Sequence, residues 1–219
     1  MYSTALTRGF RAEGGGQRAT GSRTKHIRLQ RLAFRADAAT LSRMRGETNR
    51  AKLERLMAAI GEHVSGSGVV YLTGGATALL FGWRESTIDV DIKPDPEPPG
   101  LFQAIATLKE SLDLNIELAS PDQFIPTLPR WRDRSIFIAT YGPVSFYHYD
   151  LYSQALSKLQ RGHARDVRDV EAMRSARLIE PEILARLFRE IQPQLIRYPS
   201  IDAPTFERVV REFCGRDDA

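Results

Sequence analysis

The sequence has little of what secreted and membrane proteins need. It contains one cysteine, Cys214, so it cannot form an internal disulfide, which favours a reducing cytoplasm as its compartment. No stretch approaches the roughly 20 apolar residues of a membrane span, and the N-terminus lacks the apolar core of a secretory signal. We therefore expect a cytoplasmic protein with no membrane partner.

The familiar phosphate-binding and zinc-binding patterns are also missing. There is no G-x-x-x-x-G-K-[ST], and no G-x-G-x-x-G follows a predicted strand, because Gly66 and Gly68 precede the strand instead. The few histidines do not have the paired spacing of a zinc site. These absences argue against P-loop enzymes, dinucleotide-binding dehydrogenases and zinc enzymes.

The chain divides by composition into a basic tail, residues 1–43, and a folded remainder. Of its 219 residues, 42% are hydrophobic, which is enough for a substantial core. The net charge of +4 is uneven, since the tail carries +7 and residues 44–219 carry −3. The tail is rich in Gly, Arg, Ser and Thr, and we expect it to be disordered. It is either a nucleic-acid-contacting arm or an upstream extension of a protein that starts near Met44.

The most informative stretch runs from residue 69 to residue 92. Val69–Leu72 has the composition of a strand, Gly74-Gly75 follows as a turn, and Ala76–Phe81 is predicted to begin a helix. A second predicted strand, residues 88–92, alternates apolar residues with two carboxylates. Order and spacing therefore predict strand, glycine turn, helix and strand in close succession.

The two carboxylates of this second strand are predicted to lie side by side. Successive side chains of a strand point to opposite faces, so Asp89 and Asp91 share one face while Ile88, Val90 and Ile92 turn toward the core. Two like charges on a half-buried strand repel each other, and a cation between them relieves the repulsion. The spacing therefore predicts a metal site at Asp89 and Asp91.

Other parts of the chain complete a mixed α+β pattern around this stretch. Helical spacing predicts helices over 49–64 and 101–111, the latter with Phe102, Ile105 and Leu108 on one face. Residues 114–118 alternate as a strand, and residues 135–141 and 144–149 are predicted to form a hairpin turning at Gly142-Pro143. We predict a small mixed-sheet core, residues 44–150, followed by a helical lobe, residues 151–219.

A third carboxylate is predicted on the strand at 114–118. Asn115 and Glu117 share the face opposite Leu114, Ile116 and Leu118. Glu117 is either a third metal ligand beside the two aspartates or an exposed glutamate on an edge strand, and the spacing alone does not separate these alternatives.

The helical lobe begins with a cluster of charge. At 100° per residue, one continuous helix would place Lys158 and Asp169 on the same stripe, whereas a break at Gly162 would fold a second helix back on the first. Either arrangement crowds several charged residues within twelve positions, among them Lys158, Arg161, Arg165, Asp166 and Asp169. The cluster is either part of a site or a solvated, salt-bridged helix face.

Together these residues can support chemistry on a nucleoside triphosphate. Gly74 and Gly75 let a phosphate approach the backbone N–H groups at a helix start, and the hydroxyls of Thr73 and Thr77 are additional predicted donors. The aspartates supply oxygen ligands of the kind that Mg²⁺, or Mn²⁺, prefers. Two such ions roughly 3.5–4 Å apart can assist an attacking hydroxyl and a leaving pyrophosphate.

Gly74-Gly75 followed by Asp89-Val90-Asp91 resembles the signature of the DNA polymerase β-like nucleotidyltransferase superfamily. The later run Ser157–Gly162, with Arg165, Asp166 and Asp169, resembles the second motif of AbiEii/MenT-type toxin nucleotidyltransferases and of related uncharacterised bacterial families. The resemblance spans roughly residues 44–191.

This resemblance implies a nucleotidyltransferase core and assigns roles to its residues. Asp89 and Asp91 would bind metal, Lys158 would contact the triphosphate near Arg161 and Arg165, and Asp166 or Asp169 would position or activate the catalytic groups. Glu117 as a third carboxylate fits the wider superfamily better than the toxins. The toxin branch further implies ATP or CTP as nucleotide donor, a tRNA 3′ end as acceptor and a cognate antitoxin as partner.

We therefore predict a Mg²⁺-dependent nucleotidyltransferase that moves a nucleotide from a nucleoside triphosphate to an acceptor hydroxyl. Two alternatives stay open on the sequence. One is a nucleotide-binding or partner-binding module without turnover, and the other is transfer to a small molecule of the aminoglycoside type.

Overall fold

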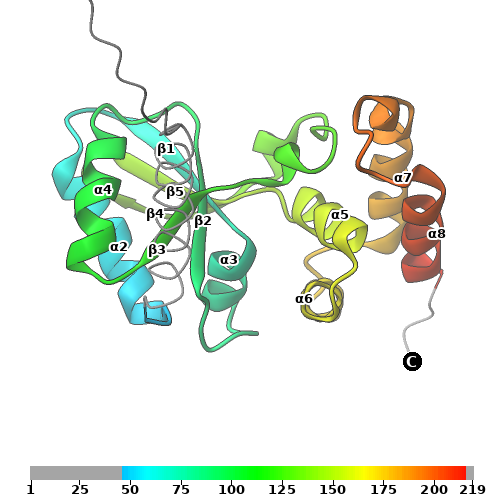
Figure 1. Cartoon of the computed structure of the whole chain (residues 1–219), viewed down its shortest axis with the longest axis horizontal. Helices are drawn as coiled ribbons and strands as arrows, with labels where there is room; N and C mark the ends of the chain where they lie inside the picture. The colour runs from blue at the N-terminus through cyan, green and yellow to red at the C-terminus, as the bar shows by residue number, and fades with distance from the viewer. Residues whose placement is uncertain (1–45, 216–219) are drawn as a thin grey trace, which may run out of the picture. The chain divides into compact units, whose positions relative to one another are not determined.

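The computed structural model describes residues 46–215, so the predicted basic tail, residues 1–43, lies outside the described residues. The described part contains seven α-helices and three short 3₁₀-helices (Figure 1). The α-helices are α2 (Arg50–His63), α3 (Gly74–Phe81), α4 (Leu101–Ser111), α5 (Leu151–Arg161), α6 (Ala164–Ser175), α7 (Pro181–Ile191) and α8 (Ala203–Cys214). The 3₁₀-helices are η1 (Pro121–Gln123), η2 (Trp131–Arg134) and η3 (Gln192–Arg197).

One mixed sheet organises the first half of the described chain. Its strands are β1 (Gly68–Thr73), β2 (Asp89–Pro94), β3 (Asn115–Leu118), β4 (Ile136–Tyr141) and β5 (Val144–His148), in the order β3-β2-β1-β5-β4. The pairs β2–β3 and β1–β5 are parallel, and β1–β2 and β4–β5 are antiparallel. This mixed sheet with separate C-terminal helices confirms the predicted α+β class.

Helices α2 and α4 cover one face of the sheet (Figure 1). Helix α2 begins after Asn49, whose Oδ1 accepts a 2.9 Å hydrogen bond from the N–H of Lys52 and caps the helix. The apolar side chains of both helices pack against the inward residues of β1, β2 and β5 in one buried cluster. Burying this apolar stripe stabilises the sheet and leaves its opposite face free to carry polar groups.

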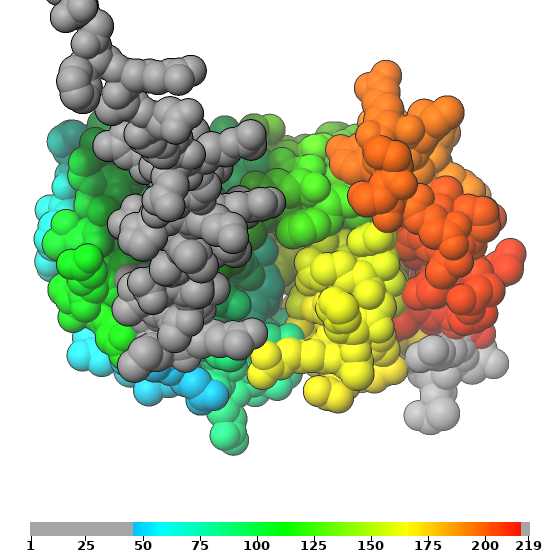
Figure 2. Space-filling view, viewed as in Figure 1, coloured from blue at the N-terminus to red at the C-terminus, as the bar shows by residue number. Residues whose placement is uncertain are grey.

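The last helices gather around a second apolar cluster. It contains residues of α5 to α8 together with Ile125 and Leu128 from the segment before β4. Figure 2 shows α5 and α6, in yellow, in contact with the orange and red helices that follow. The division of the chain at residue 150 remains a prediction.

Ile88, which was predicted to turn toward the core, is exposed, and so are two other apolar side chains. Ile88 is 47% exposed because the β2 ladder begins one residue later, at Asp89. Phe102 is 44% exposed because the buried stripe of α4 is formed by other residues, including Leu101 and Ala104. Leu118 is 50% exposed, since it is the last residue of the edge strand β3.

The break at Gly162 is the correct alternative for the charged segment. Gly162 has φ +68°, a left-handed conformation that favours glycine, and it ends α5 so that α6 starts at Ala164. The two helices pack against each other, which brings Lys158 of α5 and Asp169 of α6 together across the turn.

Candidate active site

Strands β2 and β3 bring three carboxylates to one face of the sheet. Asp91 pairs with Thr73 of β1 on one side and with Glu117 of β3 on the other, while Asp89 pairs with Asn115. Residues paired across neighbouring strands project to the same face, so Asp89, Asp91 and Glu117 belong to one surface. The predicted side-by-side placement of the aspartates agrees with this register.

Asn115 joins two of these carboxylates. Its Nδ2 donates to Oδ1 of Asp89 at 2.6 Å and to Oε1 of Glu117 at 2.9 Å. Because Asn115 is buried, its amide is a fixed donor that orients both acidic side chains. The sequence assigns Asn115 no role in the site, although its position two residues before Glu117 predicts that the two share a face.

The strand β1 leads directly into α3 through Gly74. Gly74 has φ +59°, and a Cβ atom on it would lie 2.5 Å from Oδ2 of Asp91. Its N–H donates to Oε1 of Gln154 at 2.9 Å, so this amide is engaged by a side chain of α5. Gly75 is equally constrained, since an added Cβ would meet Oγ1 of Thr87 at 2.0 Å. The two glycines thus permit the close approach of the Asp91 carboxylate and of the chain before β2.

The two predicted threonine donors occupy different environments. Thr73 lines the pocket described below, as the phosphate-contact prediction requires. Thr77 is fully buried, and its hydroxyl donates to the carbonyl oxygen of Leu72 at 3.1 Å and accepts from Nε2 of Gln154 at 3.2 Å. The structure therefore places Thr77 in the support beneath the glycine turn and not on the pocket wall.

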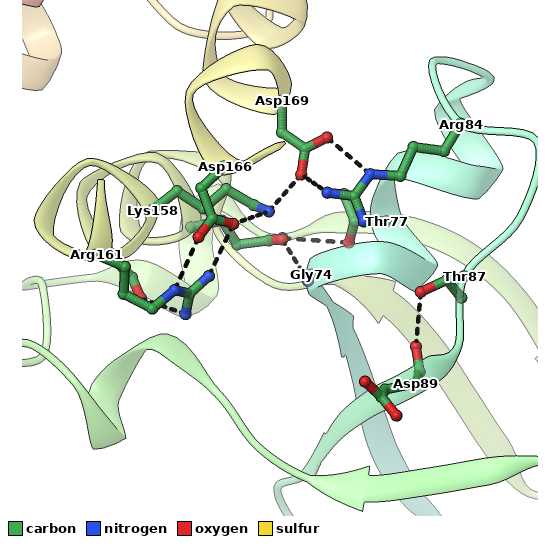
Figure 3. A network of polar contacts seen from close by, with 11 residues as sticks. Gly74, Thr77, Arg84, Thr87, Asp89, Lys158, Arg161, Asp166 and Asp169 are labelled. Carbon is green, nitrogen blue, oxygen red and sulfur yellow. Dashed lines mark hydrogen bonds and ion pairs between the residues drawn. The ribbon is translucent and has the colours of Figure 1, made fainter. Parts of the chain in front are cut away.

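A chain of ion pairs connects α5, α6 and the loop after α3. Nζ of Lys158, a residue only 3% exposed, donates to Oδ2 of Asp169 at 2.5 Å and to Oδ1 of Asp166 at 3.2 Å. Arg161 donates to both oxygens of Asp166 at 3.1 Å. Figure 3 shows that Asp169 also accepts two hydrogen bonds from the guanidinium of Arg84. The charged cluster is thus an ordered network that reaches the sheet half of the chain.

The two aspartates of this network act on the lysine and the arginines. Burial raises the pKa of Asp166, but the hydrogen bonds and charges of Arg161 and Lys158 outweigh it and hold that pKa below its usual value. Asp166 and Asp169 both accept hydrogen bonds from Lys158, and the positioning role that the resemblance implies for them stays a prediction.

Two of the three sheet carboxylates and the basic end of α5 meet at one pocket of about 220 Å³, which Asp89 does not line. Asp91 and Glu117 line it from the sheet, and Lys158 and Arg161 line it from α5. The remaining lining residues are Thr73, Gly74, Ala119, Ser120, Pro121, Phe124, Gln154 and Ser157. Opposite charges thus face one cavity, as expected of a site for an anionic substrate bound beside a cation.

Comparison with protein families gives one match. A family described as nucleotidyltransferases of unknown function (DUF6036) matches residues 51–210, which is most of the chain. The chain belongs to this family. It is therefore a nucleotidyltransferase, and the matched range contains every residue of the pocket. No curated protein and no solved structure is significantly similar to it, and the AbiEii/MenT-type specificity stays a prediction.

The donor set of this DUF6036 nucleotidyltransferase suits a hard divalent cation that is shared with a substrate. Burial, Glu117 and Asp89, in that order, raise the pKa of Asp91 to about 6, a sign of crowded negative charge on the sheet face. Within residues 46–215, no three acidic, histidine or cysteine side chains are close enough to enclose a metal alone. Mg²⁺ typically takes one or two carboxylates and completes its shell with water and substrate phosphate, and these carboxylates fit that pattern.

Arg165 is exposed and lines a second pocket, so the structure separates it from Lys158 and Arg161. No helix in the described range is long and apolar enough to cross a membrane.

Gly74→Ala is expected to cost more stability than Gly82→Ala. Both glycines are left-handed, with φ +59° and +89°, so each substitution costs about 1–2 kcal/mol in backbone strain. A Cβ at Gly82 would have no atom within 4 Å, whereas one at Gly74 would collide with Asp91. We expect Gly74→Ala to lower the free energy of unfolding by at least about 1 kcal/mol more. Urea unfolding of both variants measures the difference, and equal losses would contradict the close packing of Gly74 against Asp91.

Proposed function

We propose that this nucleotidyltransferase moves a nucleotide from a nucleoside triphosphate to an acceptor hydroxyl in a Mg²⁺-dependent reaction, with Mn²⁺ as the alternative ion. The observation that carries the proposal is the single pocket lined by Asp91 and Glu117 on one side and by Lys158 and Arg161 on the other. A triphosphate needs cationic donors, and its metal needs carboxylates, so one cavity offers both partners.

In this proposal the residues of the chain bind and orient the triphosphate. Arg161 and Lys158 attract its phosphate oxygens, and Asp166 and Asp169 hold these two cations in place. Asp89 and Asp91, with Glu117 as a candidate third carboxylate, would hold the divalent ion, which supplies positive charge next to the phosphates when bound. The acceptor hydroxyl oxygen then forms a bond to the α-phosphorus and releases its proton to solvent, while the bond from the α-phosphorus to the α–β bridging oxygen breaks and pyrophosphate leaves.

We place the tRNA 3′ end first among acceptors, with ATP or CTP as donor and the protein acting in the cytoplasm as a toxin restrained by an antitoxin. The support for this choice is the resemblance of the Lys158 segment to the AbiEii/MenT-type toxins. The open pocket and its charges suit other acceptor hydroxyls too, so the assay below includes a small-molecule acceptor.

Asp89→Asn is expected to reduce nucleotide transfer by at least about 100-fold, because it removes one charge from the carboxylates that would hold the ion. The full chain is incubated with Mg²⁺ and each α-³²P-labelled nucleoside triphosphate, with total tRNA or an aminoglycoside as acceptor. Asp133→Asn is the matched control, since Asp133 is an exposed surface aspartate paired with Arg130.

Each outcome of this assay separates the candidate functions. Labelled tRNA supports the toxin-like function, and a labelled aminoglycoside supports small-molecule transfer. Equal labelling by wild type and Asp89→Asn would overturn the assignment of the site. Nucleotide binding that persists in EDTA, with no label transferred to any acceptor and no pyrophosphate released, would instead indicate a binding module.

A further inference from the structure

A second pocket lies on the other side of the ion-pair network from the pocket described above. It has a volume of about 340 Å³ and is formed by the loop after α3 and by one face of α6. Its lining residues are Trp83, Arg84, Glu85, Ser86, Arg165, Arg168, Asp169 and Ala172. It shares no lining residue with the first pocket, and its wall contains the Arg84–Asp169 pair that connects to Lys158 (Figure 3).

The second pocket carries an excess of positive charge. Arg84 is engaged by Asp169 through two hydrogen bonds, so that pair contributes little net charge. Arg165 and Arg168 are exposed, and within residues 46–215 neither donates a hydrogen bond or forms an ion pair. Only Glu85 opposes them in the lining. Two arginines three positions apart on a helix repel each other, so an anion between them would be stabilising.

The side chain of Trp83 forms part of the wall of the second pocket. Nε1 of Trp83 is buried and has no hydrogen-bond partner among the described residues. The Trp83 ring is stacked on Phe81, with centroids 5.1 Å apart and planes 7° apart, so the indole is held in place. The pocket thus offers two guanidinium groups that have no acceptor among the described residues, beside a fixed indole whose own N–H is buried.

We propose that this second pocket is an anion site that takes a phosphate group. Arg165 and Arg168 are its ligands, and Trp83 forms its wall. The phosphate has two possible sources. One is the backbone of a nucleic-acid acceptor, and this source rests on the proposed function. The other is a free phosphate compound, which is independent of the proposed function. A phosphodiester bound here would tether an acceptor strand next to the residues that hold Lys158.

The test compares the full-length wild type, Arg165→Gln/Arg168→Gln and the control Arg186→Gln, in EDTA and without nucleotide. Arg186 is an exposed arginine of α7 that lines neither pocket. One arm measures binding of a short fluorescein-labelled single-stranded RNA across a salt series. Each lost phosphate contact should reduce the magnitude of the slope of log K against log salt by about 0.7. The slope of the double variant should therefore be smaller by about 1.4, and its RNA affinity should be roughly tenfold lower. The basic residues 1–43 are common to all three proteins.

The second arm measures the rise in melting temperature caused by inorganic phosphate relative to chloride at equal ionic strength. If the double variant loses RNA affinity and salt dependence while Arg186→Gln does not, the result supports a nucleic-acid phosphate. Unchanged RNA binding with loss of the phosphate-induced rise supports a free phosphate compound. No change in either arm, or an equal loss in Arg186→Gln, would overturn the anion site. Because neither arm requires turnover, the result is separate from that of the transfer assay.

Discussion

Asp91→Asn is expected to abolish nucleotide transfer and, at the same time, to stabilise the metal-free protein. Burial raises the pKa of Asp91, and the neighbouring charges of Glu117 and Asp89 raise it further, from 3.8 to about 6. A raised carboxyl pKa contributes stability below the unfolded-state pKa of 3.8, and this stability is lost as the pH rises through about 6. An asparagine carries no charge, so at pH 7.5 in EDTA the variant should be about 1–3 kcal/mol more stable. Transfer should fall by at least about 10²–10³-fold.

The experiment combines urea unfolding in EDTA between pH 4 and pH 7.5 with the transfer assay. The gain in stability should be small near pH 4, where Asp91 is protonated, and should grow toward pH 7.5. Asp133→Asn should change neither property, because Asp133 is exposed. A variant that is less stable than wild type at pH 7.5 would contradict the crowded-charge account of the site.

Asp169→Ala is expected to lower the free energy of unfolding by about 3–5 kcal/mol. Asp169 is almost completely buried and accepts hydrogen bonds from both Lys158 and Arg84, so its removal leaves two cations without this partner. Thermal or urea unfolding measures the loss. The matched control is Asp133→Ala, which breaks an exposed aspartate–arginine pair and should cost about 0–1 kcal/mol.

A double-mutant cycle separates the Lys158–Asp169 interaction from general damage to the helices. We expect Lys158→Met and Asp169→Ala together to cost less than the sum of the single variants, with a coupling of about 1–3 kcal/mol. Additive losses would show that the 2.5 Å ion pair does not stabilise the junction of α5 and α6.

The central part of the site could be predicted from local sequence. The alternation of Asp89 and Asp91 fixes a shared face once the segment is a strand, and the glycine pair after the first strand predicts the turn at Gly74. The same rule placed Asn115 and Glu117 together. Each of these features depends on residues only a few positions apart, so local spacing is enough to predict it.

The rest depends on pairing between distant segments, which local spacing does not encode. The N–H of Gly74 donates to the side chain of Gln154, which is 80 positions away in the sequence. Arg84 donates to Asp169, which is 85 positions away. Nothing near Arg84 in the sequence indicated a partner. Likewise, the spacing of Arg165 predicted that it would join Lys158, but the break at Gly162 turns α6 so that Arg165 lines the second pocket. Turn geometry and sheet register decide such contacts.

The most direct test of the proposed reaction compares two labels in one assay. The full chain is incubated with Mg²⁺, tRNA and the same nucleoside triphosphate carrying ³²P at either the α- or the γ-position. Nucleotidyl transfer predicts that the α-label enters the acceptor, that the γ-label leaves as pyrophosphate, and that Asp91→Asn eliminates both signals. Transfer of the γ-label to the acceptor, or release of γ-labelled inorganic phosphate without any labelled acceptor, would contradict the account.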